Sequence, residues 1–190
     1  MKLKYKILLG SNSPRRREIL ELLRLPFTVA TIEGIDESYP QDLDPGKVSE
    51  YISNKKADAF VKRLHHDELV ITADTVVICD GKILGKPKDN KEACRMLEFL
   101  SGKTHKVTTG VTLATKNKRV SFSSDSLVTF ADLSQEEILY YVDTFHPLDK
   151  AGAYGIQEWI GAVAVARMNG SFYNVMGLPV HRLYQELKKF

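Results

Sequence analysis

A basic segment near the N-terminus carries the residue types that bind small anions. Residues 11–17 read SNSPRRR and follow a short apolar run, a pattern in which a strand leads directly into a helix. Such a junction aims free backbone N–H groups and the positive end of the helix at one point. The segment adds hydroxyl donors and forked guanidiniums that suit phosphate oxygens, from Ser11, Ser13, Arg15 and Arg16. It therefore predicts an anion site.

Three adjacent arginines favour this interpretation over an ordinary helix start. Cations near a helix N-terminus oppose the helix dipole, and three together repel one another. A bound anion would remove both penalties; the alternative is a capped surface helix with solvated arginines. The sequence has no G-x-x-x-x-G-K-S/T pattern, so a P-loop nucleotide site is not expected.

A single aspartate, Asp74, interrupts an apolar run that extends from Leu69 to Ile78. A buried carboxylate is costly unless it is paired or bound to a metal, which makes Asp74 a candidate for chemistry. The alternative is a solvent-facing residue at the end of a strand. Glu37 lies in an acidic loop and could share a divalent cation with Asp74, because Mg²⁺ prefers such oxygen ligands.

Two lysines and a run of small residues complete the candidate set. Lys86 lies in the tight turn Gly85–Pro87, and Lys56 lies on a predicted helix. Residues 149–157 read DKAGAYGIQ, and their small side chains allow a ligand or a neighbouring strand to approach the backbone closely. Gln157 could read the edge of a base through its amide. For the lysines the alternative is an ordinary solvated role.

These residues need elements that hold them in place, and the sequence marks several. Ser13–Pro14 and Asp44–Pro45 each predict a helix that begins with an N-cap and a proline. Residues 134–137 (SQEE) predict a capping box for a helix that runs to Phe145. Further helices are expected over residues 90–100 and from 179 onward, and strands over 5–9, 27–32, 68–79, 107–114 and 120–130.

Three turn signals predict hairpins, and they decide the type of sheet. They are Asp80–Gly81, residues 116–118, and Asn169–Gly170 between short strands at 162–165 and 172–175. Helices and strands alternate along the chain, but hairpins require antiparallel neighbours. We therefore expect an α/β or α+β fold with a mixed sheet rather than a purely parallel one.

Composition and charge limit the class of protein. The 190 residues predict one domain over 1–190, and 43% hydrophobic with 27% charged residues is ordinary for a globular protein. Neither a membrane span of ~18 apolar residues nor a secretory segment is visible, which predicts a cytoplasmic protein without membrane contact. The net charge is only +3, and residues 1–17 hold six basic side chains and no acid. This focus predicts a small anion rather than a nucleic acid as partner.

Eight motifs, in order along nearly the whole chain, resemble the Maf family of septum formation inhibitor-like nucleotide pyrophosphatases. The resemblance implies an elongated mixed β-sheet with flanking helices and two lobes around a cleft, similar to inosine triphosphate pyrophosphatases. It is compatible with a homodimer. The motifs are Ser11–Arg16 (SNSPRR), Asp36–Glu37, Lys56–Ala57, Ala73–Val77 (ADTVV), Gly85–Pro87 (GKP), Ser101–Val107 (SGKTHKV), Asp149–Gln157 (DKAGAYGIQ) and Gly177–Pro179 (GLP).

The resemblance also implies a reaction and roles for particular residues. It implies hydrolysis of a nucleoside triphosphate, dTTP or UTP by its subgroup pattern, to the monophosphate and pyrophosphate. Asp74 would accept the proton, and Glu37 and Asp74 would hold a divalent metal, Mg²⁺ or Mn²⁺. The residues that would bind the phosphates and determine substrate choice are Ser11, Arg15, Arg16, Lys56, Thr75, Lys86 and Gln157.

The sequence departs from the family pattern at two places. Residues 145–147 (FHP) replace the usual Gly-Glu-Pro, and Glu158 stands where a glycine usually follows the Ile-Gln pair. Glu158 places an acid beside Gln157, which bears on base preference but not on phosphate chemistry.

The rival interpretation is a nucleotide-sensing regulatory protein acting on cell division. The two acids favour catalysis. A sensor would not need them, because without a metal the carboxylates would repel the polyphosphate. In cells the enzyme would clear unwanted nucleotides from the pool.

Overall fold

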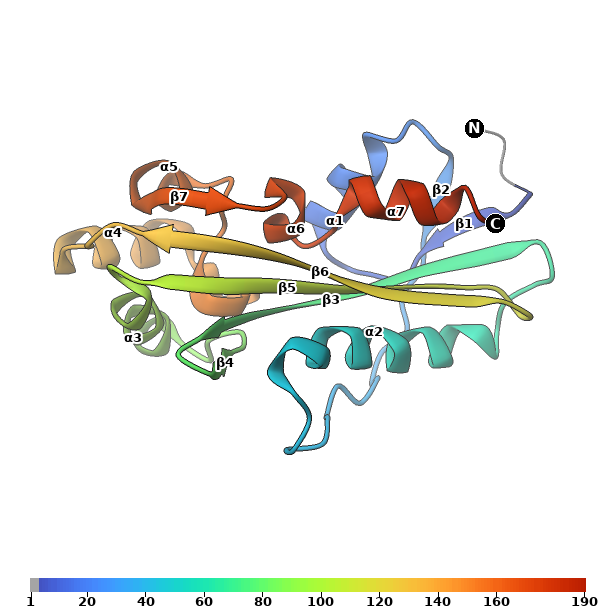
Figure 1. Ribbon diagram of the computed structural model, residues 1–190, viewed down its shortest axis with the longest axis horizontal. Helices are drawn as coiled ribbons and strands as arrows, with labels where there is room; N and C mark the ends of the chain where they lie inside the picture. The colour runs from blue at the N-terminus through green and yellow to red at the C-terminus, as the bar shows by residue number, and fades with distance from the viewer. Residues whose placement is uncertain (1–3) are drawn as a thin grey trace. The chain divides into compact units, whose positions relative to one another are not determined.

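The computed structural model describes residues 4–190 as a mixed α/β fold (Figure 1). Its sheet has seven strands in the order β2-β1-β3-β5-β6-β7, and β4 pairs with β3. The strands are β1 (Lys6–Leu9), β2 (Phe27–Val29), β3 (Glu68–Cys79), β4 (Lys82–Leu84), β5 (Thr104–Ala114), β6 (Arg119–Phe130) and β7 (Val165–Asn169). The helices are α1 (Pro14–Glu21), α2 (Pro45–Val61), α3 (Asn90–Leu100), α4 (Gln135–Phe145), α5 (Trp159–Ala164), α6 (Phe172–Met176) and α7 (Val180–Leu187), with short 3₁₀ turns η1 (Pro147–Asp149) and η2 (Ala151–Ala153).

Strand directions confirm the predicted mixed sheet. β1 runs parallel to both β2 and β3, which requires helical crossovers, and α1 and α2 supply them. β4 is antiparallel to β3 and β7 is antiparallel to β6. Leu9 at the end of β1 pairs with Ile71 of β3, so the basic segment that follows β1 begins beside the part of β3 that continues to Asp74.

Three helix starts form as their capping residues predict. The Ser13 hydroxyl accepts a hydrogen bond from the Arg16 amide, and the Asp44 carboxylate accepts one from Gly46. At α4, Ser134 and Glu137 form both hydrogen bonds of a capping box. Capping by Ser13 fixes the start of α1 within the basic segment, residues 11–17, so the first turn of α1 carries its arginines at the predicted place.

The third predicted hairpin is wrong. Asn169–Gly170 ends β7, but residues 172–176 form α6 instead of a returning strand. The Ser171 hydroxyl accepts a hydrogen bond from the Asn174 amide, a helix-start contact that competes with the turn. β7 itself pairs with β6, so its partner comes from a distant part of the sequence.

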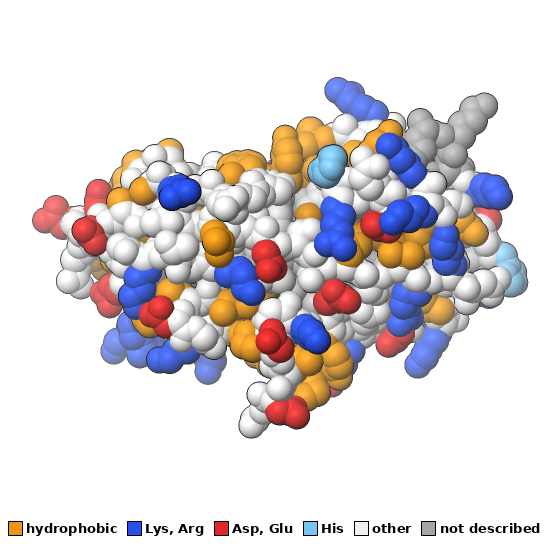
Figure 2. Space-filling view, in the orientation of Figure 1, with side chains coloured by type: hydrophobic (Ala, Val, Ile, Leu, Met, Phe, Trp, Pro, Cys, Tyr) orange, Lys and Arg blue, Asp and Glu red, His pale blue; other side chains and the backbone are white. Residues whose placement is uncertain are grey.

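Basic and acidic side chains share one face of the molecule (Figure 2). On the face drawn in Figure 2, acidic side chains lie among the basic ones. Among residues 4–190, no helix combines the length and apolar character that crossing a bilayer requires.

The chain forms two compact units. The first comprises the described residues up to Asp74, residues 109–124 and residues 177–190. In its core Ala57 and Phe60 of α2 pack with Val70 of β3 and Ala114 of β5. The backbones of α2 and β5 nearly touch at Gly110, where a Cβ atom would lie 2.2 Å from the Glu50 amide nitrogen. This contact fixes α2, and α2 carries Lys56.

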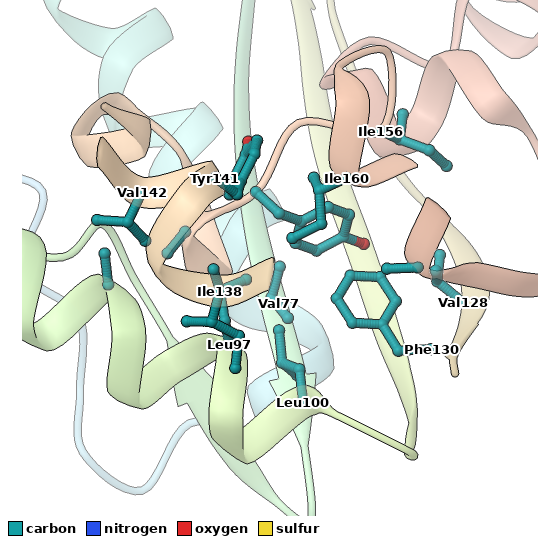
Figure 3. Close-up of a cluster of buried hydrophobic side chains, with 14 of the residues drawn as sticks. Val77, Leu97, Leu100, Val128, Phe130, Ile138, Tyr141, Val142, Ile156 and Ile160 are labelled. Atoms are coloured by element: carbon teal, nitrogen blue, oxygen red, sulfur yellow. The ribbon is translucent and has the colours of Figure 1, made fainter. Parts of the chain in front are cut away.

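The second unit comprises residues 75–108 and 125–176 and has its own apolar core. Leu97 of α3 and Ile138 of α4 lie next to each other in that core (Figure 3). His105 and Tyr154 are buried in the same unit and make edge-to-face contacts with Phe130. The core supports the segment 149–158, which holds Gln157.

Candidate active site

Arg16 is the central arginine of the basic segment, residues 11–17, and lies in the first turn of α1 with its guanidinium turned inward. Its Nε donates to the Gly177 carbonyl at 2.8 Å and its Nη1 donates to the Ala73 carbonyl at 2.9 Å. Nη1 also contacts the Ser11 hydroxyl at 3.4 Å. Arg16 therefore ties the start of α1 to the strand residue that precedes Asp74 and to the segment that leads into α7.

The electrostatics of Arg16 reflect this position. Burial lowers the pKa of the Arg16 guanidinium, and the negative charge of Asp74 opposes part of that shift. The neighbouring Arg15 lowers the pKa further, and Glu37 raises it. An arginine stays charged through such shifts, so the site has a fixed positive charge beside its two acids.

Lys56 links the two predicted acids. Its ammonium lies 2.9 Å from Asp74 Oδ1 and 3.1 Å from Glu37 Oε1. The side chains of Lys56 and Asp74 are each 13% exposed, whereas that of Glu37 is 55% exposed. Asp74 is thus a paired, largely buried carboxylate in the middle of β3 rather than a solvated residue at a strand end.

The loop that carries Glu37 is attached to α2 by the preceding lysine. Lys55 Nζ lies 2.8 Å from Asp36 Oδ2 and donates to the Ser38 carbonyl at 2.8 Å. Hydrogen bonds from Lys55, and then from the Ser38 amide and hydroxyl, hold the pKa of the Asp36 carboxyl well below its usual range. Because residues on both sides of Glu37 are tethered to Lys55, the exposed Glu37 is held within reach of Lys56.

The two carboxylates fit a divalent cation. Glu37 and Asp74 already converge on one positive charge, the Lys56 ammonium. Mg²⁺ is commonly held by one or two carboxylates together with substrate phosphates rather than by an all-protein cage. No group of three or more His, Cys, Asp or Glu side chains in residues 4–190 has the arrangement of a metal site.

The structure brings some of the expected residues together and places others elsewhere. One connected cluster in the first unit contains five of them: Ser11, Arg16, Glu37, Lys56 and Asp74. Arg15 lies next to Arg16 on the first turn of α1.

Three more residues from the sequence analysis belong to the second unit: Thr75, Lys86 and Gln157. Thr75 is partly buried in β3, whereas Lys86 and Gln157 are exposed. The Gly85 carbonyl accepts a hydrogen bond from the Gly152 amide at 3.0 Å. This bond joins the turn of Lys86 to the segment that holds Gln157.

Sequence reasoning missed the groups that support Gln157. Lys150 is buried and pairs with Asp149 and Glu158, and the Tyr141 hydroxyl contacts Glu158. The sequence held two signals for this network, a lysine within a run of small residues and the acid Glu158 beside Gln157. The role of Gly177 as an acceptor for Arg16 was also missed, because the two residues lie 161 positions apart.

Solved structures confirm the predicted fold class. The Ham1 protein of Staphylococcus aureus matches with a TM-score of 0.54 at 16% identity, over 97% of this chain and 98% of that one. A HAM1 protein from Coxiella burnetii matches with a TM-score of 0.51 at 15% identity, over 98% and 100% of the two chains. Identities this low show the fold alone.

Sequence comparisons identify the family. A protein of Porphyromonas gingivalis named dTTP/UTP pyrophosphatase is 57% identical over 189 residues, covering 98% of this chain and 95% of that protein. Proteins of the same name from Bacteroides thetaiotaomicron and Christiangramia forsetii are 54% and 40% identical, and each alignment covers at least 94% of both chains. The model of the family described as Maf-like protein matches residues 6–190. The chain belongs to the Maf-like protein family.

Proposed function

We propose that this protein hydrolyses nucleoside triphosphates, dTTP and UTP above others, to the monophosphate and pyrophosphate. The observation that carries the proposal is the pairing of Asp74 and Glu37 on Lys56, next to the basic segment, residues 11–17. Relatives that are 40–57% identical bear the name dTTP/UTP pyrophosphatase. Such an enzyme would clear unwanted nucleotides from the cellular pool.

The basic groups of the first unit suit a triphosphate. Arg15 lies in the first turn of α1, where backbone N–H groups and the positive helix end attract anions. Lys56 is held by the two acids and can exchange one of these contacts for a phosphate oxygen. Ser11 adds a hydroxyl, and Lys86 is a further phosphate ligand under this proposal. Phosphoryl transfer depends mostly on positioning and charge neutralisation, which such groups supply.

Asp74 is the proposed general base. A water oxygen forms a bond to the α-phosphorus while the bond from that phosphorus to the bridging oxygen breaks, and pyrophosphate leaves. The proton of the attacking water passes to the Asp74 carboxylate. Lys56 and Arg16 keep this carboxylate in place, the first by direct contact and the second through the Ala73 carbonyl.

Glu37 and Asp74 would hold a divalent metal, Mg²⁺ or Mn²⁺. When bound, the metal supplies positive charge that neutralises the polyphosphate and lets it approach two carboxylates. Thr75 and Gln157 would select the base, because a hydroxyl and an amide offer a compact set of donors and acceptors to a pyrimidine edge.

The experiment is a nucleotide panel in which pyrophosphate and orthophosphate are assayed separately. We expect UMP and pyrophosphate from UTP, and slower turnover of purine triphosphates. Asp74→Asn keeps the size of the side chain but accepts no proton, so kcat should fall by ~10²–10⁴-fold while the variant still folds. The matched control is Asp42→Asn, an exposed loop aspartate.

Two results would contradict the proposed reaction, and a third would contradict the role of Asp74. UDP with orthophosphate as products would exclude cleavage at the α-phosphate. Tight binding of UTP without any product would instead support the nucleotide-sensing alternative. Turnover by Asp74→Asn within threefold of the parent would move the base to another residue, with Glu37 the next candidate.

A further inference from the structure

A hydrogen-bonded network lies next to the loop that carries Gln157, and Glu158 is its centre. Glu158 Oε1 lies 3.1 Å from Lys150 Nζ. Glu158 Oε2 accepts a hydrogen bond from the Tyr141 hydroxyl. The Gly155 amide in turn donates to the Tyr141 oxygen at 3.0 Å. The network thus connects α4, the loop backbone and the first residue before α5.

The donors and acceptors of this network have only one consistent arrangement. A tyrosine hydroxyl has a single proton to donate, and its oxygen already accepts from the Gly155 amide. The proton must therefore point at the Glu158 carboxylate. Burial, followed by the hydrogen bond to Glu158, raises the pKa of Tyr141, so the hydroxyl keeps its proton at physiological pH. Hydrogen bonds linked in this way strengthen one another.

Charge and burial make Glu158 the main internal partner of Lys150. The Lys150 side chain is 8% exposed, and a buried ammonium without a counter-charge is costly. Asp149 also contacts Lys150 at 2.8 Å, but its side chain is 55% exposed and its charge is screened by water. The Glu158 side chain is 19% exposed, so its charge acts on Lys150 with less screening.

The chain around Gln157 is anchored on both sides. Ile156 is 7% exposed and belongs to the apolar core of the second unit, whereas Gln157 is exposed. Glu158 holds the N-cap position of α5, yet its side chain does not cap that helix. The Glu158 side chain instead packs against the backbone of Gly155, where an added Cβ would lie 2.9 Å from Glu158 Cδ.

We propose that Glu158 is a positioning residue for substrate selection: by bridging Lys150 and Tyr141 it fixes the backbone on which Gln157 presents its amide. The inference rests on the proposed function, in which Gln157 reads the base. A fixed backbone leaves the amide few orientations, so less conformational freedom is lost when a pyrimidine binds. Glu158 therefore acts on the Michaelis constant and on base selectivity rather than on the chemical step.

The test compares Glu158→Gln and Tyr141→Phe with the parent. Glu158→Gln removes the charge that faces Lys150, and Tyr141→Phe removes the hydroxyl while leaving the Glu158–Lys150 pair. Glu136→Gln is the matched control, because Glu136 is exposed on α4 outside the network. Two quantities are measured: kcat and KM for UTP and CTP, and hydrogen exchange of the Gly155 amide.

For Glu158→Gln we expect KM for UTP to rise by about fivefold or more with kcat within about twofold, a shift of roughly 1 kcal/mol in binding. The ratio of kcat/KM for UTP over CTP should fall, and the Gly155 amide should exchange faster. Tyr141→Phe should show the same directions, and it supplies the test if Glu158→Gln does not fold. Glu136→Gln should match the parent.

Three outcomes would overturn the inference. One is an unchanged exchange rate at Gly155 in both variants. Another is faster exchange with an unchanged UTP-to-CTP ratio, which would make the network merely structural. A third is a fall in kcat at constant KM, which would place Glu158 in the chemical step. A parent protein that hydrolyses neither nucleotide would refute the proposed function instead, and the exchange measurement would still report on the network.

Discussion

Lys56 holds together two acids that would otherwise repel each other. Two carboxylates that share one ammonium at 2.9 and 3.1 Å form a stable triplet only while that cation remains. A divalent metal would compete with the ammonium for the same oxygens. At the residue scale, under the proposed function, the lysine is therefore both a phosphate ligand and an internal substitute for the proposed metal.

We predict that Lys56→Met binds Mn²⁺ more tightly than the parent in the absence of nucleotide. Removing the ammonium frees Glu37 and Asp74 and deletes a nearby positive charge. Charge pairs near a protein surface interact by about 4 kcal/mol at 4 Å, so a gain of at least about tenfold in affinity is expected. Electron paramagnetic resonance of free Mn²⁺ measures it.

Lys47→Met is the control for this prediction, since Lys47 is exposed on the same helix and its loss changes the net charge equally. Equal Mn²⁺ affinity in both variants would mean that net charge, not displacement of the ammonium, governs metal binding.

At the element scale, α2 connects the packing of the first unit to its chemistry. Ala57, next to Lys56, is fully buried, and the backbone of the helix approaches β5 at Gly110. The site lysine is thus placed by a contact that only a glycine allows. A shift of α2 would carry Lys56 away from β3 and Asp74.

Gly110→Ala should destabilise the protein by about 3 kcal/mol, the upper end of the range for overpacked cores. The added Cβ would meet backbone atoms of Ser49 and Glu50 at 2.2–2.4 Å, and backbone cannot rotate away as a side chain can. Urea denaturation measures the change. Gly85→Ala is the control, because no atom lies within 4 Å of its Cβ position. Equal midpoints for the two variants would refute the close approach.

Local signals in the sequence were sufficient for the elements that depend on adjacent residues. The caps at Ser13, Asp44 and Ser134 satisfy amides two or three residues away, so the sequence contains both partners. The strand β3 and the helix α3 also have the predicted bounds. The hairpin at Asn169–Gly170 failed because a turn signal does not specify which strand returns.

The candidate site was predicted by residue type but not by contact. Family motifs named Glu37, Lys56 and Asp74, yet nothing local shows that one ammonium joins both acids. Arg16 donates to the backbone carbonyls of Gly177 and Ala73, and every residue has a carbonyl, so the sequence does not indicate these acceptors. The partners of Glu158 were missed for a related reason, since α4 and the loop of Lys150 meet only after folding.

At the scale of the whole molecule, each unit encloses groups that depend on its folded state. His105 is the clearest case in the second unit. It is 1% exposed, its Nε2 lies 2.8 Å from the Tyr154 hydroxyl, and its Nδ1 has no hydrogen-bond partner in the described chain. Burial lowers the pKa of His105 to about 4. The folded chain therefore resists a proton that the unfolded chain accepts.

This difference predicts acid sensitivity. The ordinary pKa of histidine is about 6.5, so between pH 6.5 and 4 the unfolded chain binds more protons and stability falls as the pH falls. The full loss from His105 is about 3 kcal/mol. His105→Gln should lower stability at pH 8 but flatten its decline between pH 7 and 4.5, measured by urea denaturation.

His66→Gln, an exposed histidine variant, should keep the steep decline of the parent. A decline in His105→Gln as steep as in the parent would assign the acid sensitivity to other groups.

The long separation between Arg16 and Gly177 has a consequence for how the protein is made. A ribosome adds Gly177 161 residues after Arg16. Until then the guanidinium lacks the Gly177 carbonyl as an acceptor, and the first unit lacks residues 177–190. The proposed hydrolytic activity therefore requires that synthesis has passed Gly177, and a chain that stops before this residue yields no working fragment.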